Sequence, residues 1–184
     1  MSHGGAPPPE RIVLVGFMAA GKSTVGPVLA RRLGWEFVDL DDRIREETGR
    51  TPAAILRDEG EAAFRRLEAA LTDGLAGRRR LVLAPGGGWV TQPGLARRLG
   101  PGTVRVWLRV SLDEALRRAD TSEADRPLLG PPDGRRERVA ALLERRRADY
   151  AAAELTVDVD GREPADVADE IVGRLGLGRE RDER

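Results

Sequence analysis

One octapeptide near the N-terminus restricts the possible folds more than any other feature of this chain. Residues 16–23, GFMAAGKS, fit the pattern GxxxxGK[ST]. A continuous apolar run, Ile12–Val15, comes directly before it, and a segment with helical periodicity, Lys22–Leu33, follows. In this strand–loop–helix context the pattern forms a phosphate-binding loop. The chain is therefore expected to contain a β-strand and an α-helix joined by a loop that binds phosphate groups.

The residue types in this loop indicate its ligand. Glycines let the backbone curl, so that its N–H groups and the N-terminus of the helix face a phosphate. Lys22 adds a mobile cation at the β- and γ-phosphates, and the Ser23 hydroxyl is a ligand for Mg²⁺. We therefore expect a purine nucleoside triphosphate with magnesium, held by Ala19, Ala20, Gly21, Lys22, Ser23 and Thr24.

The rest of the chain alternates short apolar runs with amphipathic stretches, which is typical of a parallel sheet covered by helices. Its length of 184 residues fits one domain, which we expect over 11–177 between disordered tails at 1–10 and 178–184. The expected strands are Ile12–Val15, Glu36–Leu40, Leu81–Ala84, Thr103–Arg109 and Leu155–Val159; the expected helices are Lys22–Leu33, Asp42–Glu47, Pro52–Asp58, Glu61–Leu75, Gly94–Leu99, Leu112–Ala119, Arg135–Tyr150 and Pro164–Leu175.

Charge and hydropathy exclude several classes of function. Thirty-one basic and 31 acidic residues leave a formal net charge of zero, so no general field attracts nucleic acid or an anionic membrane. The longest apolar run is far shorter than the ~20 residues that span a bilayer, and the first ten residues show no signal peptide. We expect a cytoplasmic protein that acts on small molecules, with no nucleic-acid or membrane partner.

Missing residue types narrow the chemistry further. The chain has no cysteine, and its one histidine, His3, lies in a Gly/Pro-rich tail. Disulfides, Cys/His zinc sites, cysteine nucleophiles and His-based triads are thereby excluded. A proton acceptor must then be a carboxylate. Anion-binding side chains are expected to be arginines, because Lys22 is the only lysine among the 31 basic residues.

Two carboxylates end the second expected strand. Asp39 and Asp41 are two residues apart, so on a strand they project from the same face. They lie at the carboxyl edge of the sheet, where open α/β sheets bind ligands, and paired acids there suit a metal ion and a substrate. The alternative is that one of the three acids Asp39, Asp41 and Asp42 only caps the helix that follows. We assign that role to Asp42.

Arginines on two expected helices are candidates for anion binding. Glu68 falls nearly within the apolar stripe of its helix, where a carboxylate needs a partner, and Arg65 at i−3 is within reach. A surface ion pair is the alternative for these two residues. Arg146 lies in the middle of the inner face of the later helix, with Arg145 and Arg147 on its flanks. Burial of Arg146 would require an anionic partner.

Two loops complete the set of candidate sites. The residues Gly86–Gly88 follow the third expected strand, where consecutive N–H groups form either an anion- or hydroxyl-binding nest or a plain turn. Trp89 adjoins these glycines, so we expect it at the rim of a substrate site. The segment Asp120–Gly134 has no periodicity and is expected to be an exposed loop. Arg126 in this loop is either solvated or closes over a transferring phosphoryl group.

Together these residues resemble the shikimate kinase family, small P-loop kinases of the nucleoside-monophosphate-kinase type. The matching elements, in family order over nearly the whole chain, are GFMAAGKST, DLD at 39–41, FRRLE at 64–68, the triple glycine, RPLL at 126–129 and RRADY at 146–150. The resemblance implies a three-layer α/β/α P-loop fold with a five-stranded parallel sheet in the order 2-3-1-4-5. It also implies a helical substrate-binding segment at about 41–74 and a mobile lid at about 120–134.

The resemblance further implies an activity and a role for each site residue. The family transfers the γ-phosphoryl group of ATP to the 3-hydroxyl of shikimate, on the route to chorismate and the aromatic amino acids. Asp41 would accept the hydroxyl proton, and Lys22 and Arg126 would flank the γ-phosphate. Ser23 and, through water, Asp39 would hold Mg²⁺. Substrate contacts would come from Arg65, Gly86, Gly87, Gly88 and Arg146, and the ATP contacts Arg118, Arg162 and Pro164 would lie near the adenine.

Two alternatives remain open at this point. One is a kinase for another small polyol such as gluconate. The other is a catalytically inactive shikimate-kinase-like binding protein, in which the long loop engages a partner and Trp89 marks a remodelled site. We expect the protein to be a monomer.

Overall fold

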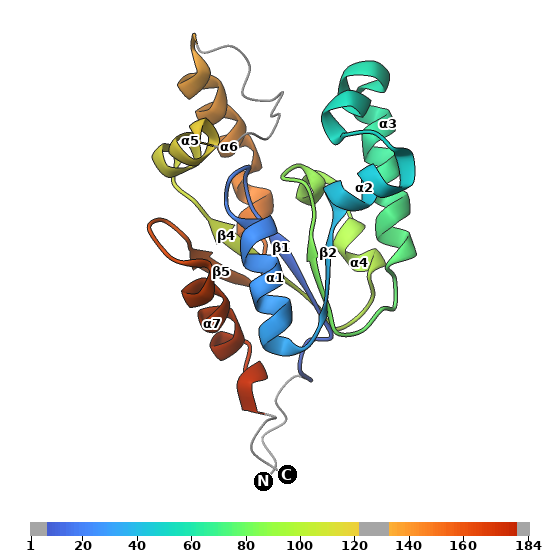
Figure 1. Cartoon of the computed structure of the whole chain (residues 1–184), viewed down its shortest axis with the longest axis vertical. Coiled ribbons are helices and arrows are strands. Elements are labelled where there is room, and N and C mark those ends of the chain that lie inside the picture. The colour runs from blue at the N-terminus through green and yellow to red at the C-terminus, as the bar shows by residue number, and fades with distance from the viewer. Residues whose placement is uncertain (1–6, 122–132, 180–184) are drawn as a thin grey trace.

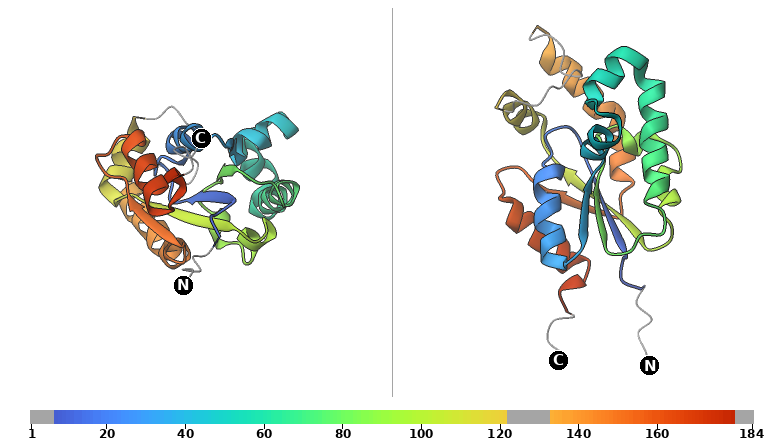
Figure 2. Two further views of the ribbon diagram at one scale, coloured as in Figure 1. Left: turned by 90° about the horizontal axis from the view of Figure 1, so that it is seen from below. Right: turned by 45° about the vertical axis from the view of Figure 1, so that its right-hand side comes forward.

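The computed structural model describes residues 7–121 and 133–179, and within these residues the fold is an α/β/α sandwich. Five parallel strands form one sheet in the order β2-β3-β1-β4-β5, which is the predicted order. Helices α1 and α7 cover one face, and α4 and α6 lie on the other (Figures 1 and 2). The strands are β1 (Arg11–Val15), β2 (Glu36–Asp39), β3 (Leu81–Ala84), β4 (Thr103–Arg109) and β5 (Leu155–Asp158).

The helices agree closely with the predicted segments. The α-helices are α1 (Lys22–Leu33), α2 (Leu40–Thr48), α3 (Pro52–Gly74), α4 (Leu95–Arg98), α5 (Leu112–Asp120), α6 (Arg135–Ala151) and α7 (Pro164–Arg174), with short 3₁₀-helices η1 (Trp89–Thr91) and η3 (Leu177–Arg179). None of the helices over 7–121 and 133–179 is both long enough and apolar enough to cross a membrane.

The centre of the sheet forms the core. Every residue of β1 and β3 is buried, as their continuous apolar runs predict for strands covered on both faces. The first residue of β1, Arg11, is charged, unlike the other buried residues of these two strands, and it is only 2% exposed. Its guanidinium donates to Thr103 Oγ1 at 3.0 Å and to the carbonyl oxygens of Arg78, at 2.6 Å, and Pro101. Arg11 thereby joins the connections at the amino end of the sheet.

The ordered chain extends past both predicted ends of the domain. The backbone N–H of Glu10 donates to the Gly102 carbonyl at 2.8 Å, so residue 10 is attached to the sheet and not part of a free tail. At the other end Leu177–Arg179 form η3, beyond the predicted boundary at residue 177. The outer parts of the two predicted tails, 1–6 and 180–184, lie outside the described residues.

The start of α2 corrects one predicted boundary and one predicted role. The strand β2 ends at Asp39, because the Asp39 carboxylate caps the helix that begins at Leu40. Its Oδ1 accepts from the backbone N–H groups of Asp41 at 2.9 Å and Asp42 at 3.4 Å. The prediction that Asp42 caps this helix is therefore wrong. Asp41 lies in the first turn of α2 and not on a strand, so the predicted strand alternation does not explain its direction.

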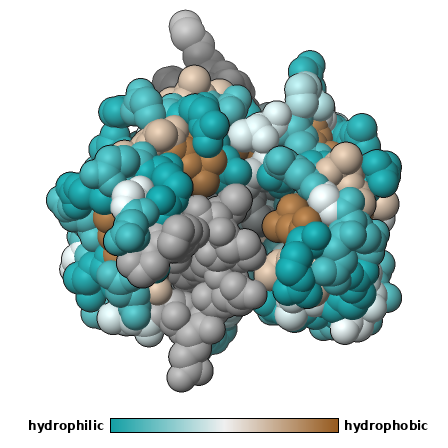
Figure 3. Space-filling model, turned by 90° about the horizontal axis from the view of Figure 1, so that it is seen from above, coloured by the Kyte–Doolittle hydropathy of each residue, from teal (hydrophilic) through white to brown (hydrophobic). Residues whose placement is uncertain are grey.

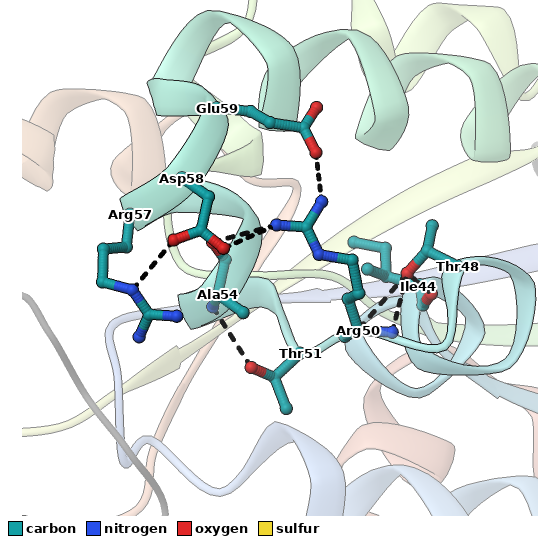
Figure 4. A network of polar contacts seen from close by, with 8 residues as sticks. All are labelled: Ile44, Thr48, Arg50, Thr51, Ala54, Arg57, Asp58 and Glu59. Atoms are coloured by element: carbon teal, nitrogen blue, oxygen red, sulfur yellow. Dashed lines mark hydrogen bonds and ion pairs between the residues drawn. The ribbon is translucent and has the colours of Figure 1, made fainter.

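Helix α3 consists of two helical pieces, as the sequence predicts. They meet at Gly60, where φ is 83° and ψ is 171°, a conformation that glycine tolerates without strain. Thr51 caps the first piece by accepting from the Ala54 N–H at 3.1 Å. Arg50 joins the turn before α3 to the residues before Gly60, since its guanidinium contacts Asp58 Oδ2 at 2.8 Å and also Glu59 (Figure 4). This network connects the turn before α3 to the end of its first piece, just before the bend at Gly60.

The long loop is only partly described. Of the predicted lid at about 120–134, residues 122–132 lie outside the described residues, and Arg126 is among them.

Packing of α1 on β2 gives a test of the fold. A Cβ on Gly26 would lie 2.2 Å from Phe37 Cε2, so we expect Gly26→Ala to lower the free energy of unfolding by about 1–3 kcal/mol through overpacking. The matched control is Gly173→Ala in α7, where a Cβ meets nothing within 4 Å. That change is expected to raise stability by about 0.5–1 kcal/mol through helix propensity. Urea denaturation measures both, and an equal effect of the two substitutions would refute the predicted contact.

Candidate active site

The phosphate-binding loop joins β1 to α1 at the carboxyl edge of the sheet, and its two pattern glycines are needed for different reasons. A Cβ on Gly16 would lie 2.7 Å from the Leu108 carbonyl oxygen, so β4 approaches too closely for a side chain there. Gly21 has φ of 91°, in the left-handed region that favours glycine. This face of the molecule is seen from above in Figure 3, where hydrophilic side chains predominate and a few hydrophobic patches lie among them.

Lys22 and Ser23 begin α1 and both turn toward the loop. The Lys22 ammonium donates to the carbonyl oxygens of Gly16 at 2.8 Å and Phe17 at 3.0 Å. The Ser23 hydroxyl donates to Asp39 Oδ2 at 2.5 Å. Because Asp39 Oδ1 caps α2, one carboxylate serves the helix and the loop together. The predicted metal residues Ser23 and Asp39 are therefore adjacent.

These two residues fit a magnesium site. In the described part of the chain no group of three or more His, Asp or Glu side chains is placed to hold a metal ion. Mg²⁺ in nucleotide sites does not need such a group, because it is held by one or two protein oxygens together with phosphates and water. The Ser23 hydroxyl and the Asp39 carboxylate, 2.5 Å apart beside the phosphate loop, supply oxygens of this kind.

A cavity of about 400 Å³ opens beside the phosphate loop. It brings together the loop and the two predicted ATP contacts Arg162 and Pro164 from the β5–α7 connection, with Arg118 from α5. Val159, Pro164 and Val167 contribute apolar side chains to its lining. The residues that line it are Ala19, Ala20, Gly21, Lys22, Ser23, Thr24, Val25, Arg118, Val159, Arg162, Glu163, Pro164 and Val167.

The two arginines of this cavity have different contacts. Arg118 donates to the Ala19 carbonyl at 3.3 Å and to the Val159 carbonyl at 2.8 Å, so it spans the cavity from the loop to the end of β5. Arg162 instead donates to Glu170 Oε2 at 2.6 Å and to backbone carbonyls of the β5–α7 region. Arg162 lines the cavity, and its guanidinium is paired with Glu170.

A second group of residues surrounds the three glycines after β3. A Cβ on Gly88 would lie 2.2 Å from Arg65 Nη2, and one on Gly87 would lie 3.5 Å from Arg146 Nη1 and 3.4 Å from the Gly16 carbonyl oxygen. The glycines thus let two guanidinium groups approach the backbone next to the phosphate loop. Asp41 Oδ1 would lie 3.7 Å from a Cβ on Gly86. The structure therefore brings together the described residues predicted for substrate binding, namely Asp41, Arg65, Gly86, Gly87, Gly88 and Arg146.

Helix α6 presents the middle arginine of its triplet to this site. Arg146 is 9% exposed, whereas Arg145 and Arg147 are exposed, as the helical periodicity predicts. One turn further on, the Tyr150 hydroxyl donates to the Gly87 carbonyl at 2.6 Å. Burial raises the pKa of Tyr150 to about 12, so the hydroxyl keeps its proton. The sequence placed Tyr150 on the inner face, but periodicity gives no sign of this hydrogen bond.

Glu68 on α3 holds Arg65 in place. The Glu68 side chain is fully buried, and its Oε2 accepts from Arg65 Nη1 at 2.6 Å and from Gln92 Nε2 at 2.8 Å. Glu61 accepts from the other side of the same guanidinium at 3.0 Å. The pair Arg65–Glu68 is therefore not a surface ion pair. Gln92 was not predicted, because a single glutamine after η1 carries no motif.

Burial also affects Asp41. Desolvation raises the pKa of the Asp41 carboxyl, the nearby Asp39 carboxylate raises it further, and the Lys22 ammonium opposes both. A carboxylate with a raised pKa accepts a proton more readily than an exposed aspartate does.

The prediction that Trp89 lies at the rim of the substrate site is wrong. Trp89 is 1% exposed, and its indole Nε1–H donates to Thr72 Oγ1 of α3 at 3.0 Å. Its backbone N–H donates to the Gly86 carbonyl at 3.0 Å, and its ring is part of the buried core. A large apolar ring gains more from burial than from a rim position. Trp89 therefore connects the glycine turn to α3 through the core.

Because the pKa of Glu68 is raised in the folded protein, the free energy of unfolding should depend on pH. Burial raises this pKa from 4.5 to about 7, against the opposing charge of Arg65. The stabilisation from the bound proton is therefore complete below the unfolded value and is lost as the pH rises through about 7. Between about pH 5 and 8 we expect wild type to lose about 1–3 kcal/mol of unfolding free energy relative to Glu68→Gln. Urea denaturation across this range measures the difference, which would be constant if the pKa were normal.

Comparison with known proteins agrees with this geometry. The family model for shikimate kinase matches residues 18–176. The shikimate kinase of Moorella thermoacetica is 44% identical over 164 residues, 89% of this chain and 92% of the relative. That of Persephonella marina is 36% identical over 166 residues, 90% of this chain and 99% of the relative.

Solved structures agree as well. Shikimate kinase from Acinetobacter baumannii in complex with shikimate has a TM-score of 0.83 and 34% identity, covering 94% of this chain and 96% of that one. A gluconokinase from Sinorhizobium meliloti, with a TM-score of 0.59 and 23% identity, shares the fold alone. With the family model spanning most of its length and relatives matched almost end to end, this chain belongs to the shikimate kinase family.

Proposed function

We propose that this protein transfers the γ-phosphoryl group of ATP to the 3-hydroxyl of shikimate, giving shikimate 3-phosphate and ADP. The observation that carries the proposal is the position of Gly87. A Cβ on Gly87 would lie 3.4 Å from the Gly16 carbonyl oxygen of the phosphate loop and 3.5 Å from Arg146 Nη1, so this glycine lies between the two. A phosphoryl donor in the loop and an acceptor at the glycines would therefore be neighbours, as a direct transfer requires.

The acceptor site suits a small acid that carries hydroxyl groups. Arg65 and Arg146 approach the glycines from two different helices, and a guanidinium matches a carboxylate through paired N–H donors. Glu68 and Glu61 fix the direction of Arg65 from behind. We assign both arginines to the shikimate carboxylate and the N–H groups of Gly86–Gly88 to its hydroxyls. Asp41 then faces the hydroxyl that is phosphorylated.

The chemistry would depend on position and charge more than on a strong base. The transition state for phosphoryl transfer is loose, so the main demands are in-line alignment and cations around the equatorial oxygens. We assign Lys22 to the γ-phosphate. Arg126, outside the described residues, is assigned to the same phosphate only from its place in the RPLL motif. Asp41, with its raised pKa, receives the hydroxyl proton as the bond to phosphorus forms.

Magnesium belongs to this proposal. Ser23 and, through water, Asp39 would hold it, and when bound it supplies positive charge at the phosphates. We expect a monomer, because the proposed reaction requires no residue from a second chain.

Turnover is the direct test. Release of ADP from ATP and Mg²⁺ is measured with shikimate and, separately, with gluconate and other polyol acids. We expect turnover with shikimate and a loss of about 10³-fold or more in kcat for Lys22→Ala, because cations at a transferring phosphate are worth that much. The unfolding temperature of Lys22→Ala serves as the folding control. Preference for gluconate would identify a different polyol kinase, and ATP binding without turnover of any polyol would identify a binding protein.

The arginine triplet of α6 tests the assignment of the acceptor site. Arg146→Lys keeps a positive charge but loses the paired donors, so we expect the KM for shikimate to rise about ten- to a hundredfold with the KM for ATP nearly unchanged. Arg145→Lys and Arg147→Lys are matched controls, since both side chains are exposed on the same helix. Steady-state kinetics with each substrate varied in turn measures all three. A larger shikimate defect in either control than in Arg146→Lys would overturn the assignment.

A further inference from the structure

A carboxylate on the first turn of α5 has no part in the reaction described above. Glu114 is 14% exposed, contacts Arg118 and does not itself line the cavity. We propose that Glu114 is a positioning residue for the nucleotide, because it fixes the Arg118 guanidinium as one wall of the base end of the cavity. The inference rests on the proposed function, since it requires that ATP occupies this cavity.

The contacts of Arg118 leave its guanidinium little freedom. Its Nε donates to Glu114 Oε1 at 2.6 Å, one turn back along α5. Its two terminal nitrogens donate to the carbonyls of Ala19, at 3.3 Å, and Val159, at 2.8 Å. All three nitrogens are thus engaged, and the plane of the group is fixed by three different elements. Without Glu114, the two backbone contacts alone would hold a long side chain that has several rotatable bonds.

Glu114 is itself held in place. The Ser111 side chain caps α5 by accepting from the Glu114 backbone N–H at 3.2 Å. The Ser111 backbone N–H in turn donates to Asp160 Oδ1, at 3.0 Å, in the connection that leads from β5 to the cavity. Hydrogen bonds from Arg117 and Arg118 lower the pKa of Glu114 to about 2, so its carboxylate stays charged at neutral pH. The N-terminal turn of α5 is therefore a rigid support for Arg118.

Arg118 reaches from the phosphate loop, at the Ala19 carbonyl, to the part of the cavity that suits a base. It contacts the Val159 carbonyl, and Val159, Pro164 and Val167 form the apolar wall beside it. A flat guanidinium beside an apolar wall provides a surface on which an aromatic ring stacks. Lys22 and Ser23 line the phosphate end. Loss of the Arg118 orientation should therefore weaken binding of the base and leave binding of the phosphates intact.

Glu114 could act through its charge or through its hold on Arg118, and the two predict opposite changes in ATP affinity when its charge is removed. ATP is a polyanion, so removing a nearby negative charge should strengthen its binding if Glu114 acts only through the electrostatic field. If Glu114 acts by holding Arg118, the same removal should weaken binding. In Glu114→Gln the side-chain oxygen still accepts from Arg118 Nε, but without the carboxylate charge that strengthens this contact, so the sign of the change in ATP affinity separates the two.

The chain offers a matched control in Arg117. This residue contacts the same carboxylate, with its Nε 2.7 Å from Glu114 Oε2, but its side chain is 65% exposed and it is not among the residues that line the cavity. Arg117→Gln removes the charged donor that contacts Glu114 Oε2 and one positive charge at the surface, and it leaves the Arg118 side chain unchanged.

The experiment measures dissociation constants by calorimetry for ATP and for inorganic tripolyphosphate, each with Mg²⁺. For Glu114→Gln we expect ATP to bind about three- to tenfold more weakly and tripolyphosphate to bind as it does to wild type. Arg117→Gln should bind both ligands as wild type does. Kinetics should agree, with a higher KM for ATP and an unchanged KM for shikimate. In the background of Arg118→Ala, Glu114→Gln should have no further effect on ATP, because the residue through which it acts is gone.

Three results would overturn the inference. They are unchanged or tighter ATP binding by Glu114→Gln, an equal loss of ATP and tripolyphosphate, and additive effects of the Glu114 and Arg118 substitutions. The second would mean that the phosphate loop itself is disturbed. Failure of wild type to bind ATP is a distinct outcome, which would overturn the proposed function and the inference with it.

Discussion

The hydrogen bond from the Tyr150 hydroxyl to the Gly87 carbonyl is the contact on which the arrangement of both sites depends. At 2.6 Å it attaches the glycine loop after β3 to helix α6, which also carries Arg146. The Tyr150 ring is in turn stacked on Trp107 of β4, with 6.0 Å between ring centroids. Strand β4 also lies against Gly16 of the phosphate loop. The phosphate loop, the glycine loop after β3 and helix α6 are therefore all held in contact with one buried pair of aromatic rings, Tyr150 and Trp107.

Buried charge is the main cost of this arrangement, and the chain meets it by pairing. Glu68 is fully buried and has two donors on one oxygen, while its second oxygen has no hydrogen-bond partner among the described residues. A buried carboxylate in that condition is destabilised as an anion, which explains its raised pKa. The pairing nevertheless keeps the Arg65 guanidinium aimed at Gly88, where a free arginine would turn to solvent. The buried Glu68 carboxylate therefore lowers the free energy of unfolding but fixes the direction of the Arg65 guanidinium.

Periodicity and motif spacing predicted much of the fold and part of the site. The apolar runs located β1 and β3, and helical rotation selected Arg146 from three adjacent arginines, because both signals depend only on the regular geometry of strands and helices. Prediction was less successful where side chains compete for backbone groups. Asp39 rather than Asp42 caps α2, because the carboxylate that reaches two free N–H groups determines where the helix begins. Trp89 was misplaced because its partner, Thr72, is distant in sequence and belongs to no motif.

The two oxygens of Asp39 have a consequence for how the substrates would affect each other. Oδ2 meets Ser23 at the proposed metal site, and Oδ1 holds the first turn of α2, where Asp41 faces the proposed acceptor. If binding of Mg²⁺ and nucleotide displaced this carboxylate, the hydrogen bond from the Asp41 N–H to Oδ1 would transmit the displacement to α2. Thermodynamic linkage is reciprocal, so an acceptor that favours one position of α2 must change the affinity for metal–nucleotide by the same factor. A single aspartate would thus make the two binding events cooperative without any subunit interface.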